Sequence, residues 1–497
     1  MRIRFLFPVM AFTFFCILST ASAQLNWNIT NEKTEDSEVY SFLGESEQGY
    51  GFVFTFPTQK AFSSVKYGIA IRHFDQDMRQ TNQIGLPDNM PPFLRVRGFN
   101  DYIVVSGGGG GDRDVNGYNV TVFLDDQGLE LEQKSWKLSG NRHLWAGSNT
   151  WVSSDSAYFI VCKTEQCIPD KPSLDDDPLV NHVVVFDGDL KIVWEGSYEN
   201  LSFSPKKNAL KIEGMDFIND KQLLIFGTET IDKQPYAVAY TLPDAKSNAV
   251  QVLKEKIPIV TSAMIYTYLN TYFFLSPSND LFVFSYYTKD GIPQNMQFIR
   301  QNLDNVSDKK VSYYRIDKNF AAKYPYFGKG NKQFPVFTGI RLWNDGLIVG
   351  GEYFTESPVS LRDISLLKFG YDGDIQWVKT IKKTSYGISP VQRNMMRFFT
   401  RGDELVVFYY DFPENVTSDV LITNPRVSLA IQLPNQSCLA TALISSDGKV
   451  LNRKILNRYK ENQITIDNST IFQADEDHYI IQAAKDYKNA FSTYSME

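Results

Sequence analysis

The chain alternates short apolar runs with turn residues, and residues 335–383 show this pattern most clearly. Four β-favouring runs occur there, PVFTGIRLW, GLIVGGEYF, ISLLKFGY and IQWVKTIKK. They are separated by Asn-Asp-Gly at 344–346, by a polar loop that contains Pro358, and by Asp-Gly-Asp at 372–374. Asp-Gly pairs between apolar runs are typical of β-hairpins, because glycine accepts the positive φ that such turns need. The stretch therefore predicts a four-stranded antiparallel unit.

The second run of this unit recurs along the chain with a mean spacing of about 61 residues. Runs such as FVFSYY are apolar on both faces, which predicts strands that are buried on both sides. A four-stranded antiparallel unit repeated seven or eight times predicts an all-β protein with a β-propeller fold. The recurring run begins at Gly51, Tyr102, Tyr158, Leu223, Leu281, Leu347, Leu405 and Tyr479.

Several units also place a tryptophan in the polar strand that follows the aspartate-rich turn, clearly at 187–194 and 372–377 and partly at 125–136. This combination resembles secreted bacterial β-propeller repeat proteins, and the resemblance implies the architecture without implying an activity.

The last apolar run, at Tyr479, is not followed by an outer hairpin, so N-terminal residues must complete the last blade. Either residues 25–42 add strands to an eighth blade, or residues 464–485 join N-terminal strands in a ring of seven. We favour eight blades. The expected organisation is a signal peptide at 1–23, an N-terminal segment at 24–36, a propeller at 37–485 and a C-terminal tail at 486–497.

Two other architectures were weighed against the propeller. The strands of an outer-membrane β-barrel alternate polar and apolar residues over about ten positions, which FVFSYY and LIVGG do not. Two separate β-sandwiches would fit a less regular spacing of the runs. The propeller remains the preferred prediction.

The N-terminus has the features of a secretory signal. Arg2 and Arg4 precede an apolar stretch at 5–18, and Ala-Ser-Ala at 21–23 suits cleavage. We expect a protein exported to the periplasm, the cell surface or the medium. The formal net charge of −7 and the lack of a basic run argue against nucleic acid as a partner. No later run is long enough to span a membrane as a helix, and we expect a monomer.

The cysteines suggest a structural role. An exported protein meets an oxidising environment, and Cys162 and Cys167 are close enough in sequence to form a disulfide at a strand end. Cys438 lies in the apolar run CLATALI and is predicted to be a buried, free thiol.

A glycine-rich loop at 107–117 carries the main candidate metal site. Asp112, Asp114 and Asn116 place oxygen atoms at alternate positions, as in the first half of a calcium loop. The later ligand positions fall on Val120 and Phe123, so a solvated hairpin loop is the alternative. No other cofactor is predicted.

Aromatic side chains near the first strands could line the central funnel of a propeller and bind a sugar or a peptide. Packing between blades is the alternative role for them. The candidates are Trp145, Trp151, Tyr268, Trp343 and Phe398. The Arg-Gly-Asp at 401–403 is interpreted as a turn between strands.

Catalytic signatures are absent from the sequence. The four histidines are isolated, and no Gly-x-Ser-x-Gly motif occurs. We therefore favour an exported, non-catalytic propeller that binds a protein, peptide or glycan on one face. One alternative is a carbohydrate-active hydrolase or lyase that uses carboxylates from different blades. The other is a structural component of a cell-envelope assembly.

Overall fold

The computed structural model describes most of the chain beyond the predicted signal. The described residues are 25, 28–33, 38–46, 49–61, 64–85, 94–100, 102–107, 118–125, 128–138, 143–167, 179–199, 210–231, 234–244, 249–258, 267–289, 292–324, 335–356, 359–385, 396–417, 438–458, 465–485 and 488–496.

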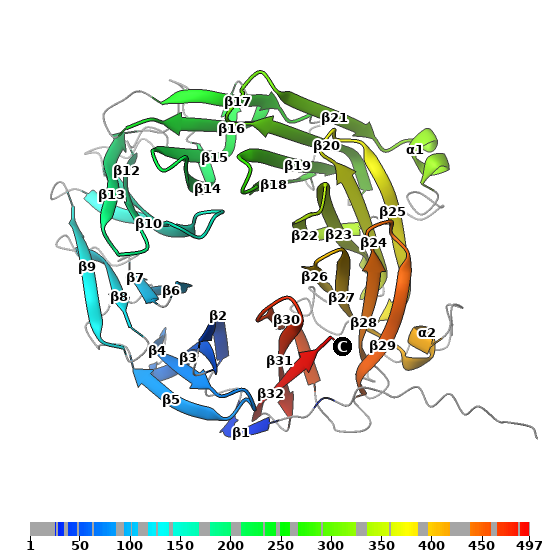
Figure 1. The fold of residues 1–497 in the computed structure, drawn as a ribbon, viewed down its shortest axis with the longest axis horizontal. Coiled ribbons are helices and arrows are strands. Elements are labelled where there is room, and N and C mark those ends of the chain that lie inside the picture. Colours follow the sequence, from blue (N-terminus) through cyan, green and yellow to red (C-terminus); the bar gives the residue numbers. More distant parts are fainter. Residues whose placement is uncertain are drawn as a thin grey trace, which may run out of the picture.

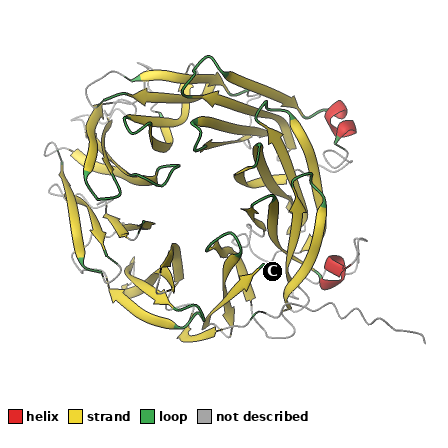
Figure 2. Ribbon diagram, viewed as in Figure 1, coloured by secondary structure: helices red, strands yellow, loops and turns green. Residues whose placement is uncertain are grey.

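Eight four-stranded antiparallel sheets follow one another around a ring (Figure 1). The fold is an eight-bladed β-propeller, which confirms the predicted fold class and the preferred blade number. In blades 1 to 7 the four strands are consecutive in the chain and run from the centre of the ring to its circumference (Figures 1 and 2).

The first four blades contain sixteen strands. Blade 1 has β2 (Glu38–Ser46), β3 (Gly49–Ala61), β4 (Ser64–Phe74) and β5 (Gln80–Gly85). Blade 2 has β6 (Leu94–Phe99), β7 (Tyr102–Gly107), β8 (Tyr118–Leu124) and β9 (Glu130–Lys137). Blade 3 has β10 (His143–Val152), β11 (Phe159–Cys167), β12 (Leu179–Phe186) and β13 (Ile192–Glu199). Blade 4 has β14 (Lys211–Ile218), β15 (Gln222–Ile231), β16 (Gln234–Leu242) and β17 (Val250–Lys256).

The other four blades complete the ring. Blade 5 has β18 (Thr267–Leu275), β19 (Asp280–Lys289), β20 (Ile292–Asn302) and β21 (Lys309–Arg315). Blade 6 has β22 (Pro335–Trp343), β23 (Gly346–Glu356), β24 (Val359–Gly370) and β25 (Ile375–Ser385). Blade 7 has β26 (Met396–Arg401), β27 (Glu404–Asp411), β28 (Cys438–Ser445) and β29 (Val450–Arg458). Blade 8 has β30 (Thr465–Gln473), β31 (His478–Lys485), β32 (Lys488–Ser495) and β1 (Asn28–Lys33).

Two short helices, α1 (Lys318–Lys323) and α2 (Pro413–Thr417), lie outside the ring of sheets (Figure 2). The carboxylate of Asp317 caps α1 by accepting hydrogen bonds from the backbone amides of Asn319 and Phe320. Within the described part of the chain, no helix is long and apolar enough to cross a membrane.

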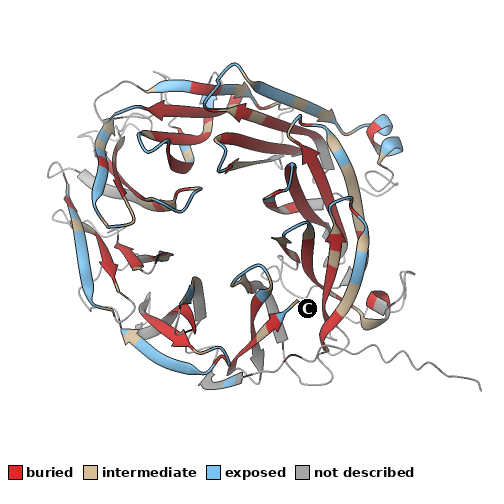
Figure 3. Cartoon of the chain, viewed as in Figure 1, coloured by how far each residue is buried: buried red, intermediate tan, exposed pale blue. Residues whose placement is uncertain are grey.

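All eight recurring apolar runs form the second strand of their blade, as predicted. The residues of these strands are buried on both faces of the sheet, whereas the fourth strands are largely exposed (Figure 3). The apolar pattern on both faces follows from this position, because each second strand is covered by the two neighbouring blades.

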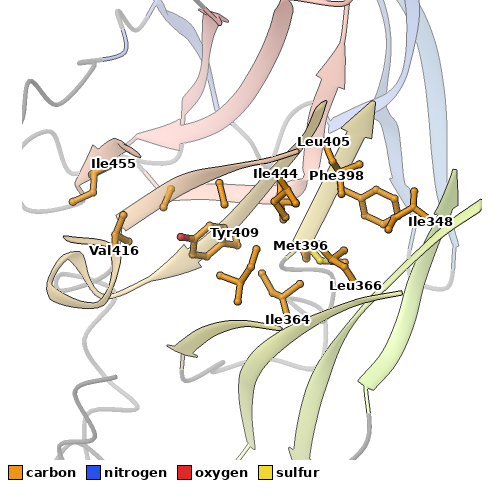
Figure 4. Close-up of a cluster of buried hydrophobic side chains, with 14 of the residues drawn as sticks. Ile348, Ile364, Leu366, Met396, Phe398, Leu405, Tyr409, Val416, Ile444 and Ile455 are labelled. Carbon is orange, nitrogen blue, oxygen red and sulfur yellow. The ribbon is translucent and has the colours of Figure 1, made fainter. Parts of the chain in front are cut away.

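The buried side chains form eight clusters, one at each boundary between neighbouring blades. The cluster between blades 6 and 7 contains Ile348 and Leu366 from one blade and Met396, Leu405 and Tyr409 from the other (Figure 4). The other seven boundaries are packed in the same way. The core of the protein is therefore a ring of apolar interfaces between sheets.

Blade 8 closes the ring with strands from both ends of the chain. β1 pairs antiparallel with β32, so that Asn28 lies opposite Phe491 and Ile29 opposite Ala490. The segment 486–497, for which we predicted a tail, contains β32, and the segment 24–36 contains β1. Joining the two ends gives blade 8 the four strands that a single terminus could not supply.

A second contact between blades depends on turn glycines. Gly448, in the turn between the third and fourth strands of blade 7, has a φ of 82°. An added Cβ there would lie 2.9 Å from Cδ2 of Trp377, on the outer strand of blade 6. The Trp377 indole also donates a hydrogen bond of 2.9 Å to the carbonyl oxygen of Ser446. The Asp-Gly turn therefore serves the hairpin and also makes room for the previous blade.

We predict that Phe491→Ala weakens the closure of the ring. The side chain of Phe491 is fully buried, and its ring centroid lies 4.9 Å from that of Phe74 and 5.7 Å from that of Phe52 across the boundary between blades 8 and 1. Emptying this site should lower the free energy of unfolding by about 3–5 kcal/mol, measured by urea denaturation.

The matched control is Leu451→Ala, because Leu451 lies on outer strand β29 and is 51% exposed. This change should alter the free energy of unfolding by no more than about 0.5 kcal/mol. Equal losses for the two variants would contradict the assignment of Phe491 to the closing interface.

Candidate functional site

One face of the ring carries the short turns of every blade. In a sheet of consecutive antiparallel strands, the turn between strands one and two and the turn between strands three and four lie at the same end. We call this end of the ring the turn face. It includes the hairpins at 153–158, 219–221 and 401–403, and the outer turns at 187–191 and 445–449.

Aspartates begin many of these turns because their carboxylates accept hydrogen bonds from the turn backbone. Oδ1 of Asp125 accepts from the amide of Leu129 at 2.7 Å. Oδ1 of Asp187 accepts from the amide of Lys191 at 2.9 Å, and Oδ1 of Asp372 from the amide of Asp374 at 2.9 Å. The local need for turn-forming residues therefore places carboxylates along the turn face.

Every blade contributes at least one carboxylate to this face. Side chains that are exposed or partly exposed in the turns include Glu45, Asp77, Asp125, Asp155, Asp189, Asp220, Asp244, Asp304, Asp345, Asp374, Asp403, Asp447 and Glu476. The described cations in the same turns are Arg79, Lys191, Lys221, Arg401 and Lys449. The turn face therefore carries a clear excess of negative charge, which attracts cationic groups in solution.

Hydrogen bonds between neighbouring blades hold the turns in place. The hydroxyl of Tyr158 donates to Oδ1 of Asp220 at 2.6 Å, which joins blades 3 and 4. The amide of Asn279 donates to Oδ1 of Asn219 at 2.9 Å, which joins blades 4 and 5. The guanidinium of Arg401 donates to Asp477 at 2.6 Å, between blades 7 and 8. Gly402 and Asp403 form the turn between β26 and β27, as predicted for the Arg-Gly-Asp tripeptide, and Arg401 ends β26 and forms the ion pair.

Asp216 is a buried carboxyl on the innermost strand of blade 4. It is 5% exposed, and its oxygens accept hydrogen bonds from the backbone amides of Ser154 and Phe217 at 2.9 and 2.7 Å. Burial disfavours the charged form and raises the pKa of Asp216 to about 6, although the two amides act in the opposite direction. This group changes its charge near neutral pH at the boundary between blades 3 and 4.

Three of the five aromatic candidates pack in or against the core, and the side chains of the other two lie outside the described residues. Trp343 is 2% exposed and Phe398 is 5% exposed, and both belong to the core between blades 6 and 7. They are closed to a ligand, so the binding role predicted for them is wrong. Trp151 is partly buried against the core between blades 3 and 4. Trp145 and Tyr268 lie in β10 and β18, and their side chains fall outside the described residues.

The predicted disulfide between Cys162 and Cys167 does not form. Cys162 is a free, buried thiol, and its sulfur lies 3.8 Å from Oδ1 of Asn181. Both cysteines belong to strand β11, where five residues of extended chain separate their Cα atoms by about 16 Å, which is too far for a disulfide. Burial raises the pKa of the Cys162 thiol to about 12. Cys438 is buried and free, as predicted.

The calcium prediction at Asp112, Asp114 and Asn116 lies outside the described residues. Among the residues that the structure does describe, no group of three or more His, Cys, Asp or Glu side chains could hold a metal ion.

Buried charged groups inside blades 3 and 6 were missed by the sequence reasoning. Lys163 and Glu165 have fully buried side chains on β11. Glu352 of β23 forms an ion pair with Lys383 of β25, again with both groups buried. A signal for them exists, because Lys163 and Glu352 each end one of the recurring apolar runs, YFIVCK and LIVGGE.

No protein-family model and no curated protein matches the chain. The solved structures to which the chain is similar at low identity include the following three. For the acylaminoacyl peptidase of Pyrococcus horikoshii the TM-score is 0.39 at 11% identity, and the match covers 90% of this chain and 58% of the peptidase. For an endo-arabinase from Bacteroides thetaiotaomicron the TM-score is 0.25 at 9% identity, and the match covers 60% of this chain and 95% of the arabinase. For the polysaccharide lyase Uly1 the TM-score is 0.39 at 8% identity, and the match covers 94% of this chain and 100% of the lyase. These similarities assign no activity to the chain.

We predict that Asp216 makes the stability of the protein depend on pH. The folded pKa of about 6 lies above the ordinary value of 3.8, so the folded state holds a proton that the unfolded state releases between these two values. The stabilisation is complete below about pH 4 and is lost as the pH rises through 6. This single group should lower the free energy of unfolding by about 3 kcal/mol across that range, since one pKa unit corresponds to 1.36 kcal/mol.

Urea unfolding between pH 4.5 and 7 measures the effect. In Asp216→Asn this part of the pH dependence should disappear, because an amide does not ionise. Asp403→Asn removes an exposed carboxylate on blade 7 and should keep the dependence, because Asp216 remains. An unchanged pH profile in Asp216→Asn would contradict the assignment.

Proposed function

We propose that this protein is an exported binding propeller whose turn face binds a cationic segment of a protein or peptide partner. The observation that carries the proposal is the distribution of carboxylates, which occur in the turns of all eight blades and outnumber the cations there. Export is part of the proposal and depends on the signal-like residues 1–23. In this proposal the turn face acts by binding and needs no catalytic group.

The rigidity of the turns supports such a role. Turn residues of neighbouring blades are tied together by the pairs Tyr158–Asp220, Asn279–Asn219 and Arg401–Asp477. Because the loops are already ordered, a partner would not have to immobilise them when it binds. Negative charge spread over a face also steers a cationic partner during its approach.

Two observations favour a cationic partner over a glycan or a carbohydrate-active centre. Exposed aromatic faces favour glycan binding, and two of the aromatic candidates, Trp343 and Phe398, are buried. Two of the buried carboxylates are also engaged inside their own blades, since Asp280 pairs with Arg300 and Glu352 with Lys383. A hydrolase or lyase with carboxylates from different blades would need these groups to converge on a shared site.

We predict that a fluorescent decalysine peptide binds the protein and that a decaglutamate peptide does not. The triple variant Asp374→Asn, Asp403→Asn and Glu476→Gln removes three exposed turn-face charges while leaving the turn-capping carboxylates in place. It should weaken decalysine binding about tenfold in 50 mM salt, measured by fluorescence anisotropy, and the loss should shrink in 300 mM salt because screening weakens exposed charges.

A matched variant has the same change in net charge on the circumference of the ring. Glu132→Gln, Glu195→Gln and Glu255→Gln all lie on fourth strands, in β9, β13 and β17. This variant should weaken binding less than about twofold, since a Debye length of about 10 Å at 0.1 M salt limits the reach of these charges. Equal effects of the two variants, or no binding of decalysine to the wild-type protein, would overturn the proposal.

A further inference from the structure

Three strands of blade 3 bring a glutamate, a histidine and a serine into one hydrogen-bonded line. Nε2 of His182 lies 2.9 Å from Oε2 of Glu165, and Nδ1 of His182 lies 2.9 Å from Oγ of Ser197. The strand register explains the alignment. His182 of β12 lies opposite Ser197 of β13 on one side and opposite Lys163 of β11 on the other. Glu165 is two residues beyond Lys163 and therefore faces the same way.

Exposure rises along this line from the carboxylate to the hydroxyl. The side chain of Glu165 is fully buried, that of His182 is 17% exposed, and Ser197 is exposed on the outer strand. A carboxylate only accepts hydrogen bonds, so the nitrogen that faces Glu165 carries the proton. Nδ1 of the neutral imidazole is then the acceptor that faces the serine hydroxyl. The arrangement holds a base against a hydroxyl at the surface.

A buried cation lies on the same face of β11 as Glu165. The ammonium group of Lys163 is held on the same face of the sheet by the hydroxyls of Ser106 and Ser148 at 2.6 and 2.7 Å and by the carbonyl of Gly107 at 3.1 Å. The Cα atoms of Lys163 and Glu165 are about 7 Å apart along the strand. An ionised glutamate orients His182 and stabilises the imidazolium form when His182 accepts a proton.

From this geometry we propose that Ser197 is an activated nucleophile and that the site accepts carboxylic esters. Ser197 and His182 are the catalytic residues, and Glu165 is a positioning residue. The site is on the circumference of the ring, between blades 2 and 3, since Glu195 on the same side of β13 forms an ion pair with Lys134 of blade 2 at 2.8 Å. It is separate from the turn face and independent of the binding proposed there.

The reaction balances with water as the only co-substrate. Oγ of Ser197 attacks the ester carbonyl carbon while its proton moves to Nδ1 of His182. The imidazolium then protonates the leaving alcohol as the carbon–oxygen bond breaks, which leaves an acyl group on Ser197. Water then attacks the acyl carbon while Nδ1 of His182 takes its proton. The bond from the acyl carbon to Oγ of Ser197 breaks as the imidazolium returns that proton to Oγ, which releases the acid and restores the serine. As an edge strand, β13 has backbone amides that are not used in the sheet and are available to the developing oxyanion.

The test is labelling of the full-length folded protein with a fluorophosphonate, followed by peptide mass spectrometry and by hydrolysis of p-nitrophenyl acetate. We expect one adduct, on Ser197. Labelling and hydrolysis should be lost in Ser197→Ala and reduced about 100-fold or more in His182→Gln, as expected for removal of a general base. Glu165→Gln should slow labelling while keeping the adduct on Ser197.

The matched control is Ser135→Ala, because Ser135 is also exposed on an outer strand, β9, and its hydroxyl accepts a hydrogen bond from Gln133 with no histidine involved. This variant should label like the wild-type protein. Thermal melting of each variant separates loss of activity from loss of folding. Absence of labelling in the folded wild-type protein, or equal labelling of Ser197 and Ser135, would overturn the proposal and leave the three residues with a purely structural role.

Discussion

Apolar packing between neighbouring blades is the interaction on which the rest of the structure depends. Each second strand is buried on both faces because it lies between two other sheets, and the eight clusters follow one another around the ring. A single blade would leave one such face exposed to water, so no blade is complete without its neighbours. The pairing of β1 with β32 and the contacts of Phe491 with blade 1 complete the last of these interfaces.

The charge of the turn face follows from the same architecture. Antiparallel strands require tight turns, and aspartate is favoured there because it can bond to the turn backbone. The carboxylates of Asp125 and Asp187, for example, accept hydrogen bonds from backbone amides of their own turns. The connectivity places all these turns at one end of the ring. The aspartates that the individual turns favour therefore form an acidic surface there. Folding requirements and binding capacity are thus met by the same residues.

The second strand of blade 3, like that of blade 6, carries buried charged groups after its apolar run. Lys163 and Glu165 are fully buried, yet one contacts the hydroxyls of Ser106 and Ser148 and the other contacts His182. Buried charges at such a position are costly unless they are paired and hydrogen-bonded. Their presence at the boundary with blade 2, next to an exposed serine, gives this part of the circumference a chemistry that the apolar boundaries do not have.

The sequence by itself determined the strands, the hairpins and the propeller class, because apolar runs and Asp-Gly turns act over a few residues. It left seven and eight blades as alternatives, because the last blade is completed by residues far apart in the chain. Long-range register decided the rest. The pairing of β1 with β32 joins residues at opposite ends of the chain, and the line from Glu165 through His182 to Ser197 joins residues 15 to 17 positions apart that look isolated in the sequence. The tertiary structure also decided that Trp343 and Phe398 face the core and that Cys162 is a buried, free thiol. Only the packed ring of sheets decides that, because a strand has two faces and its neighbours determine which of them is buried.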